Sequence, residues 1–239
     1  MRYAPVHELF VTADAAAQHG DLVADARAAG VRVVPVTDRA AAGLSDTVTP
    51  QGLVAVCDLL DVPVATALAG RPALVAVLVG VADPGNAGTV VRVADAAGAG
   101  AVLLAGDTVD PHNGKAVRAS TGSVFHLPLA RSRDAAAVLA ACRAAGLTLL
   151  AADGRGELDL HDPAAAPVLA APTAGVFGGE AHGLPAALAA AADHRVRVPI
   201  HGRAESLNLA TAAAVCLYAS AAARRSGPAQ SGGPGGPRP

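Results

Sequence analysis

The chain has 239 residues, of which 52% are hydrophobic and 16% are charged. This balance excludes a disordered protein and is enough to bury a core, in one large domain or in a small domain beside a medium one. The formal net charge of −2 excludes a global positive field that attracts nucleic acid, so any contact with RNA or DNA must come from local arginines.

The first part of the chain, residues 1–60, predicts a small α/β module. Apolar runs bounded by turn residues favour strands at residues 9–12, 31–36 and 52–57, with a helix that reaches Ala29. The following stretch, residues 61–72, is rich in small residues and has a proline near each end, which predicts a linker.

A larger α/β unit is predicted over residues 73–223. Its strands are expected where apolar runs occur, at residues 73–78, 101–105, 124–129, 147–151, 174–177 and 195–199. Helical stretches lie between several of them, including residues 89–97, and a last helix of small apolar residues is expected from residue 205 to about residue 223. This alternation is typical of a mostly parallel sheet covered by helices. The Gly- and Pro-rich residues 224–239 predict a disordered tail.

Cysteine usage and the apolar segments indicate the compartment. Cys57, Cys142 and Cys216 lie far apart without CxxC spacing, which predicts neither a disulfide framework nor a zinc site. The N-terminal stretch lacks the basic and apolar regions of a secretion signal. The most membrane-like segment, residues 207–223, is short and interrupted by polar residues, so a buried helix is the better interpretation. These features predict a reduced, cytoplasmic protein that does not cross a membrane.

Several familiar site signatures do not occur in the sequence. No GxGxxG follows a predicted strand, no GxSxG nucleophile elbow is present, and the segment from Gly106 to Lys115 has the wrong glycine spacing for a phosphate-binding loop. The eight histidines lack ligand spacing, so no metal site is expected.

Three polar, glycine-bearing segments instead follow predicted strands: DPGNAGTVVR, FGGEAHGLP and VPIHGRAESLNLATA. Open α/β sheets carry their sites at the carboxyl ends of the strands, so the three segments are candidates for one site. In the first, Asn86 is able to cap the next helix, but Arg92 within that apolar helix is left unexplained. Arg92 either reaches solvent along its stem or supplies a guanidinium to a site.

The other two segments also have two interpretations each. Gly178 and Gly179 followed by Glu180 suit a loop that approaches a ligand, and they equally suit an ordinary tight turn. Ser206 and Asn208 are the polar residues at the start of an apolar helix, and N-capping accounts for at most one of them. If Glu205 or Ser206 caps, Asn208 lies inside the helix, where it needs a partner.

Taken in this order, the three segments resemble motifs one, two and three of the SpoU (TrmH-like) family of RNA ribose 2'-O-methyltransferases, in the SPOUT superfamily. The resemblance covers residues 73–223 and includes the intermediate stretch GKAVRASTGSVFHLPL. The segments VHELFVTADAA and VTPQGLVAV resemble the family's small α/β RNA substrate-binding module, which here starts late, as if its first strand and helix were truncated.

The resemblance implies a SPOUT-type, mostly parallel α/β sheet with a deep trefoil knot at the C-terminus. It implies S-adenosyl-L-methionine as the cofactor, bound in a bent shape by the knot loops, and an obligate homodimer. The implied reaction is methylation of a ribose 2'-hydroxyl in structured RNA, with rRNA favoured over tRNA and without a metal.

The resemblance also carries over site residues by motif position. Proton removal from the 2'-hydroxyl falls to the motif-one arginine, aided by an RNA phosphate; because a guanidinium normally keeps its proton, electrostatic stabilisation of the developing alkoxide is at least an equal alternative. The catalytic positions are Arg92, Asn86, Glu180, Ser206 and Asn208. The cofactor-binding positions, mostly through backbone atoms, are Gly178, Val198, Ile200 and Leu207. At Gly179 many family members have Asn, Ser or Ala, and little effect of this departure is expected.

RNA contact is expected from local arginines together with the N-terminal module, and a solvated face is an equally good interpretation of the same residues. These arginines are Arg118, Arg131 and Arg133. A catalytically silent RNA-binding dimer on the same fold is an alternative function, against which the filled motif positions argue. A nucleotide-dependent oxidoreductase is disfavoured because the phosphate-loop signature does not occur.

Overall fold

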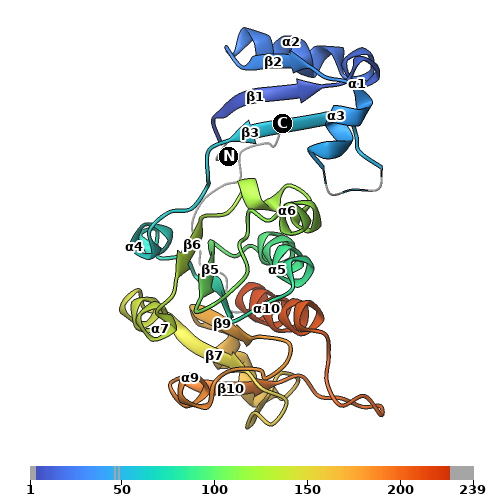
Figure 1. The fold of residues 1–239 in the computed structure, drawn as a ribbon. Coiled ribbons are helices and arrows are strands. Elements are labelled where there is room, and N and C mark those ends of the chain that lie inside the picture. The colour runs from blue at the N-terminus through green and yellow to red at the C-terminus, as the bar shows by residue number, and fades with distance from the viewer. Residues whose placement is uncertain (1–3, 46, 48, 227–239) are drawn as a thin grey trace.

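The computed structural model describes residues 4–45, 47 and 49–226, which form two units (Figure 1). The first unit is a three-stranded sheet in the order β2-β1-β3, with β2 parallel and β3 antiparallel to β1. Its elements are β1 (Val6–Val11), α1 (Ala13–Gln18), α2 (Gly20–Ala28), β2 (Arg32–Pro35), α3 (Asp38–Gly43) and β3 (Leu53–Cys57).

The first unit has a small core. Val11, Ala15 and Val23 are buried together where β1 meets α1 and α2. The single helix predicted before Ala29 is divided at His19, which ends α1 and precedes α2. Helix α3 lies where the sequence pattern predicts none, and the Thr37 hydroxyl caps it.

The second unit is a seven-stranded sheet in the order β6-β5-β4-β9-β7-β10-β8, and all of its strand pairs are parallel. The predicted α/β class with a mostly parallel sheet is therefore confirmed. Its strands are β4 (Leu74–Val79), β5 (Ala101–Ala105), β6 (Leu129–Ser132), β7 (Thr148–Ala152), β8 (Leu158–Asp159), β9 (Thr173–Gly178) and β10 (His194–Arg197). Its helices are α4 (Val64–Leu68), α5 (Pro84–Ala97), α6 (Gly114–Ser120), η1 (Ser123–Phe125), α7 (Ala135–Ala144), η2 (Pro163–Ala165), α8 (Ala166–Ala170), α9 (Ala186–Ala190) and α10 (Leu209–Ser226).

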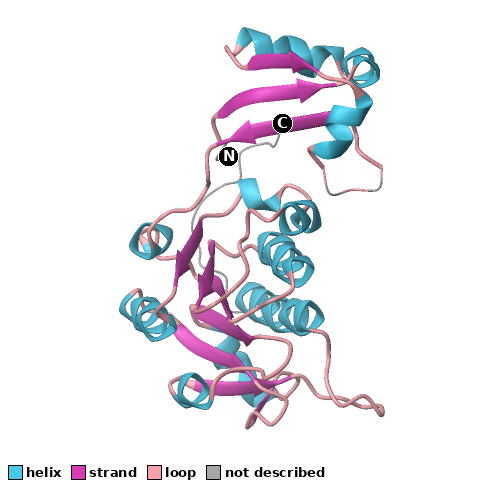
Figure 2. Ribbon diagram, in the orientation of Figure 1, coloured by secondary structure: helices cyan, strands magenta, loops and turns pink. Residues whose placement is uncertain are grey.

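Helices cover both faces of this sheet, with α5, α6 and α10 on one side and α4, α7 and α9 on the other (Figure 2). Alternate side chains of the central strand β4 serve the two layers. Leu74 and Leu78 belong to the buried cluster beneath α5 and α10. Val75 and Val77 belong to the cluster that includes α4 and α7. A strand buried on both faces reads as a continuous apolar run, which is why its position is predictable from the sequence.

Two late strands are inserted between earlier ones. Strand β9 lies between β4 and β7, and β10 lies between β7 and β8. The strand order therefore reverses direction at the boundary between β4 and β9, which is where open parallel sheets place their ligands. The trefoil knot stays a prediction, and the late insertion of these strands supports it.

The strand predicted at residues 124–129 is wrong. Residues 123–125 form the 3-10 helix η1, and β6 begins at Leu129. Thr121 and Gly122 have positive φ values of 49° and 90° and turn the chain at the end of α6. The apolar Val124 is buried from this irregular segment, and an apolar run alone does not distinguish such a segment from a strand.

Several boundaries also differ from the predictions. Helix α5 begins at Pro84, earlier than the predicted residue 89, and α10 begins at Leu209, later than residue 205. Within the predicted linker, α4 buries Ala67 and Leu68 against the second unit. Residues 224–226, predicted as part of the tail, continue α10, and residues 227–239 lie outside the described residues.

The described residues also bear on the membrane and disulfide predictions. No helix among them is long and apolar enough to cross a membrane. None of the three cysteines is paired with another: Cys57 is exposed, and Cys142 and Cys216 are buried.

Candidate active site

A cavity of about 920 Å³ lies at the carboxyl ends of β7, β9 and β10, beside the start of α10. This volume is in the range of pockets that hold small ligands and cofactors. The predicted cofactor-binding residues that line it are Gly178, Val198, Ile200 and Leu207. The predicted catalytic residues that line it are Glu180, Ser206 and Asn208.

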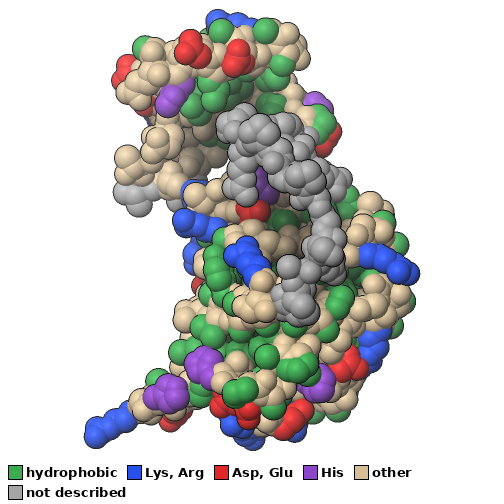
Figure 3. Space-filling model, turned by 180° about the vertical axis from the view of Figure 1, so that it is seen from behind, with side chains coloured by type: hydrophobic (Ala, Val, Ile, Leu, Met, Phe, Trp, Pro, Cys, Tyr) green, Lys and Arg blue, Asp and Glu red, His purple; other side chains and the backbone are tan. Residues whose placement is uncertain are grey.

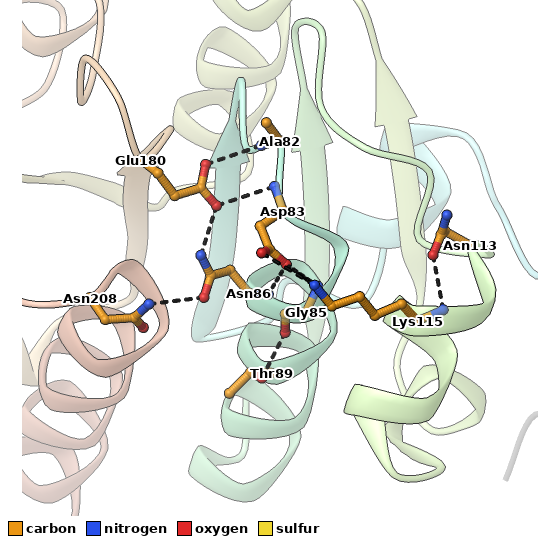
Figure 4. A network of polar contacts seen from close by, with 9 residues as sticks. All are labelled: Ala82, Asp83, Gly85, Asn86, Thr89, Asn113, Lys115, Glu180 and Asn208. Atoms are coloured by element: carbon orange, nitrogen blue, oxygen red, sulfur yellow. Dashed lines mark hydrogen bonds and ion pairs between the residues drawn. The ribbon is translucent and has the colours of Figure 1, made fainter. Parts of the chain in front are cut away.

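Glu180 is the end of a polar chain beside this cavity (Figure 4). Its carboxylate accepts hydrogen bonds from the backbone N–H groups of Ala82 (3.1 Å) and Asp83 (3.3 Å), in the loop after β4. It also accepts a hydrogen bond of 2.8 Å from the side-chain amide of Asn86. The loop after β9 is therefore tied to the loop after β4 across the boundary where the strand order reverses.

Asn86 and Asn208 extend the chain to the last helix. The Asn208 amide donates to Asn86 Oδ1 over 3.1 Å. In turn, Asn208 Oδ1 accepts from the backbone N–H groups of Ala210 (2.9 Å) and Thr211 (3.2 Å). We call Glu180, Asn86 and Asn208 the relay, because each residue hydrogen-bonds the next. The relay joins all three motif segments.

The charge of Glu180 fixes the direction of every bond in the relay. Burial by itself raises the pKa of Glu180, but hydrogen bonds from the Asn86 side chain and from nearby backbone N–H groups outweigh it and hold the pKa below its ordinary value. An ionised carboxylate only accepts hydrogen bonds. The Asn86 NH₂ group must therefore face Glu180, its carbonyl oxygen faces Asn208, and the Asn208 oxygen faces the start of α10.

The interpretation of Asn208 as a residue inside the last helix is wrong. Because α10 begins at Leu209, Asn208 precedes the helix and its side chain caps it. The same correction applies to Asn86: Asp83 caps α5, and Asn86 lies in the first turn of that helix. Capping by Asp83 leaves the Asn86 side chain available for the relay.

Lys115, the only lysine of the chain, supports the start of α5, and the sequence analysis did not assign it to the site. Its Nζ lies 3.1 Å and 3.4 Å from the two carboxylate oxygens of Asp83. Its hydrogen bond is the largest cause of a lowered pKa of Asp83. A Cβ at Gly85 would lie 3.0 Å from Lys115 Cε, so the lysine lies across a position without a side chain. Lys115 lies in the stretch GKAVRAS, which is part of the family resemblance, and that position was the sequence feature that could have pointed to it.

The paired glycines accommodate neighbouring backbone. A Cβ at Gly178 would lie 2.1 Å from the carbonyl carbon of Gly183, and one at Gly179 would lie 2.2 Å from the carbonyl oxygen of Gly80. Gly183 also donates its backbone N–H to Gly179 O over 2.9 Å. In this chain, therefore, the neighbouring backbone leaves no room for a side chain at Gly179.

Arg92 and Ser206 are the predicted catalytic residues outside the relay. Ser206 is exposed in the cavity lining. Arg92 is exposed on α5 and does not line the cavity. It lies six residues after Asn86, about 120° away around the helix. Within the described part of the chain it has no hydrogen-bond or ion-pair partner. Within a single copy of the chain, therefore, Asn86, Glu180 and Asn208 lie together, whereas Arg92 lies apart from them.

The three arginines predicted to contact RNA lie in different settings. Arg118 on α6 and Arg133 after β6 are exposed, without an ion-pair partner among the described residues. Arg131 instead contacts two carboxylates, those of Asp61 and Asp110. Among the residues that the structure describes, no group of three or more histidine, cysteine or acidic side chains is arranged to hold a metal.

The fold and the site define a class: an α/β protein with a parallel sheet, a small-ligand cavity at the carboxyl edge and a polar relay beside it. A model of the SpoU rRNA Methylase family matches residues 73–218, and a model described as RNA 2'-O ribose methyltransferase substrate binding matches residues 2–63. The chain belongs to the SpoU rRNA methylase family.

Two curated relatives illustrate the similarity. The 23S rRNA (guanosine(2553)-2'-O)-methyltransferase RlmP of Bacillus subtilis is 35% identical over 79% of this chain and 72% of the relative. The 23S rRNA (uridine(2479)-2'-O)-methyltransferase of Streptomyces viridochromogenes is 39% identical over 60% of this chain, and the match spans half of that relative.

Two solved structures show the same fold with a cofactor bound. The SpoU methyltransferase AviRb from Streptomyces viridochromogenes, in complex with AdoMet, is 30% identical with a TM-score of 0.79, over 94% of this chain and 85% of that one. An AdoMet-bound rRNA methyltransferase from Sinorhizobium meliloti is 31% identical with a TM-score of 0.74, over 94% of this chain and 81% of that one.

Proposed function

We propose that this chain is an S-adenosylmethionine-dependent methyltransferase that methylates a ribose 2'-hydroxyl in ribosomal RNA. The observation that carries the proposal is the relay of Glu180, Asn86 and Asn208, which joins the three motif segments beside a cavity of about 920 Å³. Both relatives described above are named for ribose 2'-O-methylation of 23S rRNA.

The residues of the cavity fit this cofactor. Its lining contains four acidic residues, Asp153, Asp159, Glu180 and Glu205, and Arg197 is the one Lys or Arg among its described lining residues. An excess of carboxylates suits a ligand that carries a positive sulfonium. When bound, S-adenosylmethionine supplies the electrophilic methyl group.

The backbone segments around the cavity are proposed to hold the cofactor. Val198 and Ile200 lie on the segment after β10, and Leu207 lies just before α10. Ile200 and Leu207 are large apolar side chains that remain partly exposed, at 38% and 37%. Apolar side chains at the mouth of a cavity suit a planar ring, while backbone N–H and C=O groups provide the polar contacts. Gly178 forms the floor beside them, where a side chain has no room.

The relay is proposed to position the sugar hydroxyl. Each amide in it is oriented by a partner on both sides, so the unused N–H groups of Asn86 and Asn208 have defined directions. Donors held in this way orient an incoming oxygen without reorganising. Ser206, which precedes Asn208 in the cavity lining, is proposed to contact the nucleotide. Glu180 acts by holding both amides, because its carboxylate is already occupied by three donors.

Arg92 is proposed to stabilise the developing alkoxide from a second copy of the chain. In a single chain its guanidinium is exposed and outside the cavity lining. A homodimer, which the family resemblance implies, allows the Arg92 of one copy to serve the cavity of the other. Mixing the two inactive variants Arg92→Ala and Glu180→Ala should then restore part of the activity, because mixed dimers contain one intact site. Recovery no greater than either variant alone excludes this arrangement.

Methyl transfer from labelled S-adenosylmethionine to purified 23S rRNA, 16S rRNA and tRNA tests the proposed function. We expect incorporation into rRNA at a ribose 2'-hydroxyl, located by resistance of the adjacent bond to alkaline hydrolysis. Calorimetry with S-adenosylmethionine alone reports cofactor binding separately. A chain that binds the cofactor and RNA but transfers no methyl group to any of them is the silent RNA-binding dimer, and the proposal is then wrong.

A further inference from the structure

The two units meet at a short connection between β3 and α4 (Figure 1). All substantial contacts between helices and strands lie within one unit or within the other. The orientation of the N-terminal unit therefore depends on how the connecting residues are held at each end.

The N-terminal unit holds the connection at Asp58. The backbone N–H of Asp58 donates to Pro5 O over 3.0 Å. The Asp58 carboxylate lies 2.7 Å from Nε2 of His7 on β1. Asp58 thus moves with the three-stranded sheet.

The second unit holds the connection from residue 60 onward. Asp61 forms a parallel bridge with Leu129, at the start of the edge strand β6, and the Val62 N–H donates to Leu129 O over 2.8 Å. The Leu60 N–H points at His112 Nε2, 3.3 Å away. Residues 60–62 therefore extend the edge of the seven-stranded sheet.

A cluster of charged and polar side chains reinforces this second attachment, and we call it the junction cluster: Asp61, Asp110, His112 and Arg131. Arg131 forms ion pairs with both carboxylates: its Nε contacts Asp61 Oδ2, and its Nη1 lies 3.1 Å from Asp110 Oδ1. His112 lies between the same two groups, with Nε2 3.1 Å from Asp61 Oδ1 and Nδ1 3.2 Å from Asp110 Oδ1. The cluster thus ties the connection to β6 and to the loop before α6.

Burial makes this cluster more than a surface ion pair. The side chains of His112 and Asp61 are only 15% and 23% exposed. His112 Nε2 accepts a hydrogen bond from the Leu60 N–H, so it does not donate to Asp61. The buried Oδ1 atom of Asp61 is therefore left without a hydrogen-bond donor among the described residues. Removing Arg131 would leave a partly buried carboxylate with less compensation, which costs more than the loss of an exposed pair.

Only Leu59 separates the two attachments. It is 66% exposed, more than any other large hydrophobic residue that the structure describes. A chain held tightly on both sides of one residue bends most easily at that residue. Leu59 therefore has the position of a hinge between the substrate-binding module and the catalytic unit.

We propose that Leu59 is a one-residue hinge and that Arg131, through the junction cluster, is a positioning residue for RNA capture. This proposal rests on the proposed function. Arg131 sets where the N-terminal unit stands and thereby how RNA reaches the cavity. Its guanidinium is engaged by Asp61 and Asp110, so it does not serve as a phosphate contact. In this proposal Arg131 acts on RNA indirectly, whereas the sequence analysis expects direct contact.

The test compares Arg131→Ala with Arg133→Ala, two residues along the same segment and free of ion pairs in the described structure. For Arg131→Ala we expect a KM for rRNA about tenfold higher, with kcat and cofactor affinity within about twofold. The slope of log Kd for RNA against log salt should change by much less than the value of about 0.9 for a lost phosphate contact, because the junction cluster responds only weakly to salt. Arg133→Ala, if it contacts phosphate, lowers the magnitude of that slope by about 0.9. A similar lowered slope for Arg131→Ala overturns the proposal.

A second variant tests the hinge without removing any side chain. Insertion of Gly-Gly after Leu59 should broaden the distance distribution between the units in small-angle scattering and raise the KM for rRNA about tenfold. Combining the insertion with Arg131→Ala should add little, because both act on the same orientation. The proposal is overturned if the two changes raise the KM for rRNA by factors that multiply in the combined variant. It is also overturned if neither the insertion nor Arg131→Ala changes the scattering profile. Scattering needs no activity, so failure of the hinge is distinguishable from failure of the proposed function.

Discussion

The relay and the junction cluster are both polar networks, but they are built from different chemistry. The relay joins β9, α5 and α10 through two amides and one carboxylate, and each amide is oriented from both sides. The junction cluster joins the connecting segment to β6 through the opposite charges of Arg131 and the Asp61 and Asp110 carboxylates. Directional amide bonds hold atoms in place, whereas charges hold segments together. We therefore expect the relay to control the methyl transfer step and the cluster to control RNA capture.

The largest effect is expected from breaking the relay at its centre. Asn86→Ala removes both the bond to Glu180 and the bond from Asn208, so methyl transfer should fall about a hundredfold or more while cofactor affinity changes little. Asn86→Asp should be equally damaging despite its similar size, because it places a second carboxylate against ionised Glu180. Single-turnover kinetics and calorimetry measure the two quantities.

Thr89→Ala is the matched control for this prediction. Thr89 lies one turn further along α5, and its hydroxyl donates to Gly85 O within the helix. It should retain activity within about threefold, as expected for a local side chain to backbone bond. A Thr89→Ala variant as inactive as Asn86→Ala would mean that α5 itself, and not the relay, is being disturbed.

The residues of the relay could be predicted from the sequence because they follow strands that are easily recognised as apolar runs. Glu180 and Asn208 come after apolar runs of the sheet, and parallel strands bring their carboxyl ends to one edge. The hydrogen-bonding pattern within the relay could not be predicted from the sequence. It depends on where α5 and α10 begin, and helix ends shift by several residues when a neighbouring side chain, here Asp83 or Asn208, takes the cap.

The junction cluster was not accessible from the sequence. Arg131 and Asp61 are 70 residues apart, and the predicted linker and the misplaced strand at residues 124–129 concealed the edge where they meet. An arginine in a short polar stretch looks the same whether it faces RNA or a carboxylate. The parallel bridge between Asp61 and Leu129, which brings Asp61 beside Arg131, is visible only in the folded chain.

The next effect concerns the backbone that supports the relay. Gly179→Ala places a methyl group 2.2 Å from the Gly80 carbonyl oxygen, so the loop that carries Glu180 must shift. We expect a loss of about 1–3 kcal/mol in the free energy of unfolding, as for overpacked sites. Gly154→Ala is the control, since a Cβ there meets nothing within 4 Å. Equal urea midpoints for the two variants would show that the loop adapts without cost.

A smaller effect is expected from salt, which should weaken the ionic junction cluster but not the relay. Arg131 and Asp110 are 37% and 55% exposed, so their attraction weakens as the screening length falls from about 10 Å at 0.1 M salt to about 3 Å at 1 M. Cleavage after Leu59 by chymotrypsin should become about two- to threefold faster at 1 M than at 0.1 M salt. Arg131→Ala should be cleaved fast at both. Salt-independent cleavage of the parent chain would show that the backbone bridge alone holds the connection.

The smallest expected effect is the pH dependence of the relay. Hydrogen bonds hold the pKa of Glu180 below its ordinary value of 4.5, so the ionised form is favoured by folding. That contribution is fully present above the unfolded-state pKa and is lost as the pH falls through the lower folded-state pKa. Glu180→Gln cannot lose it, so its free energy of unfolding should fall less steeply than that of the parent chain below about pH 5. Parallel curves from urea titrations would mean that the carboxylate is not held by the amides, and the fixed direction of the relay would then have to come from the cap at Asn208 alone.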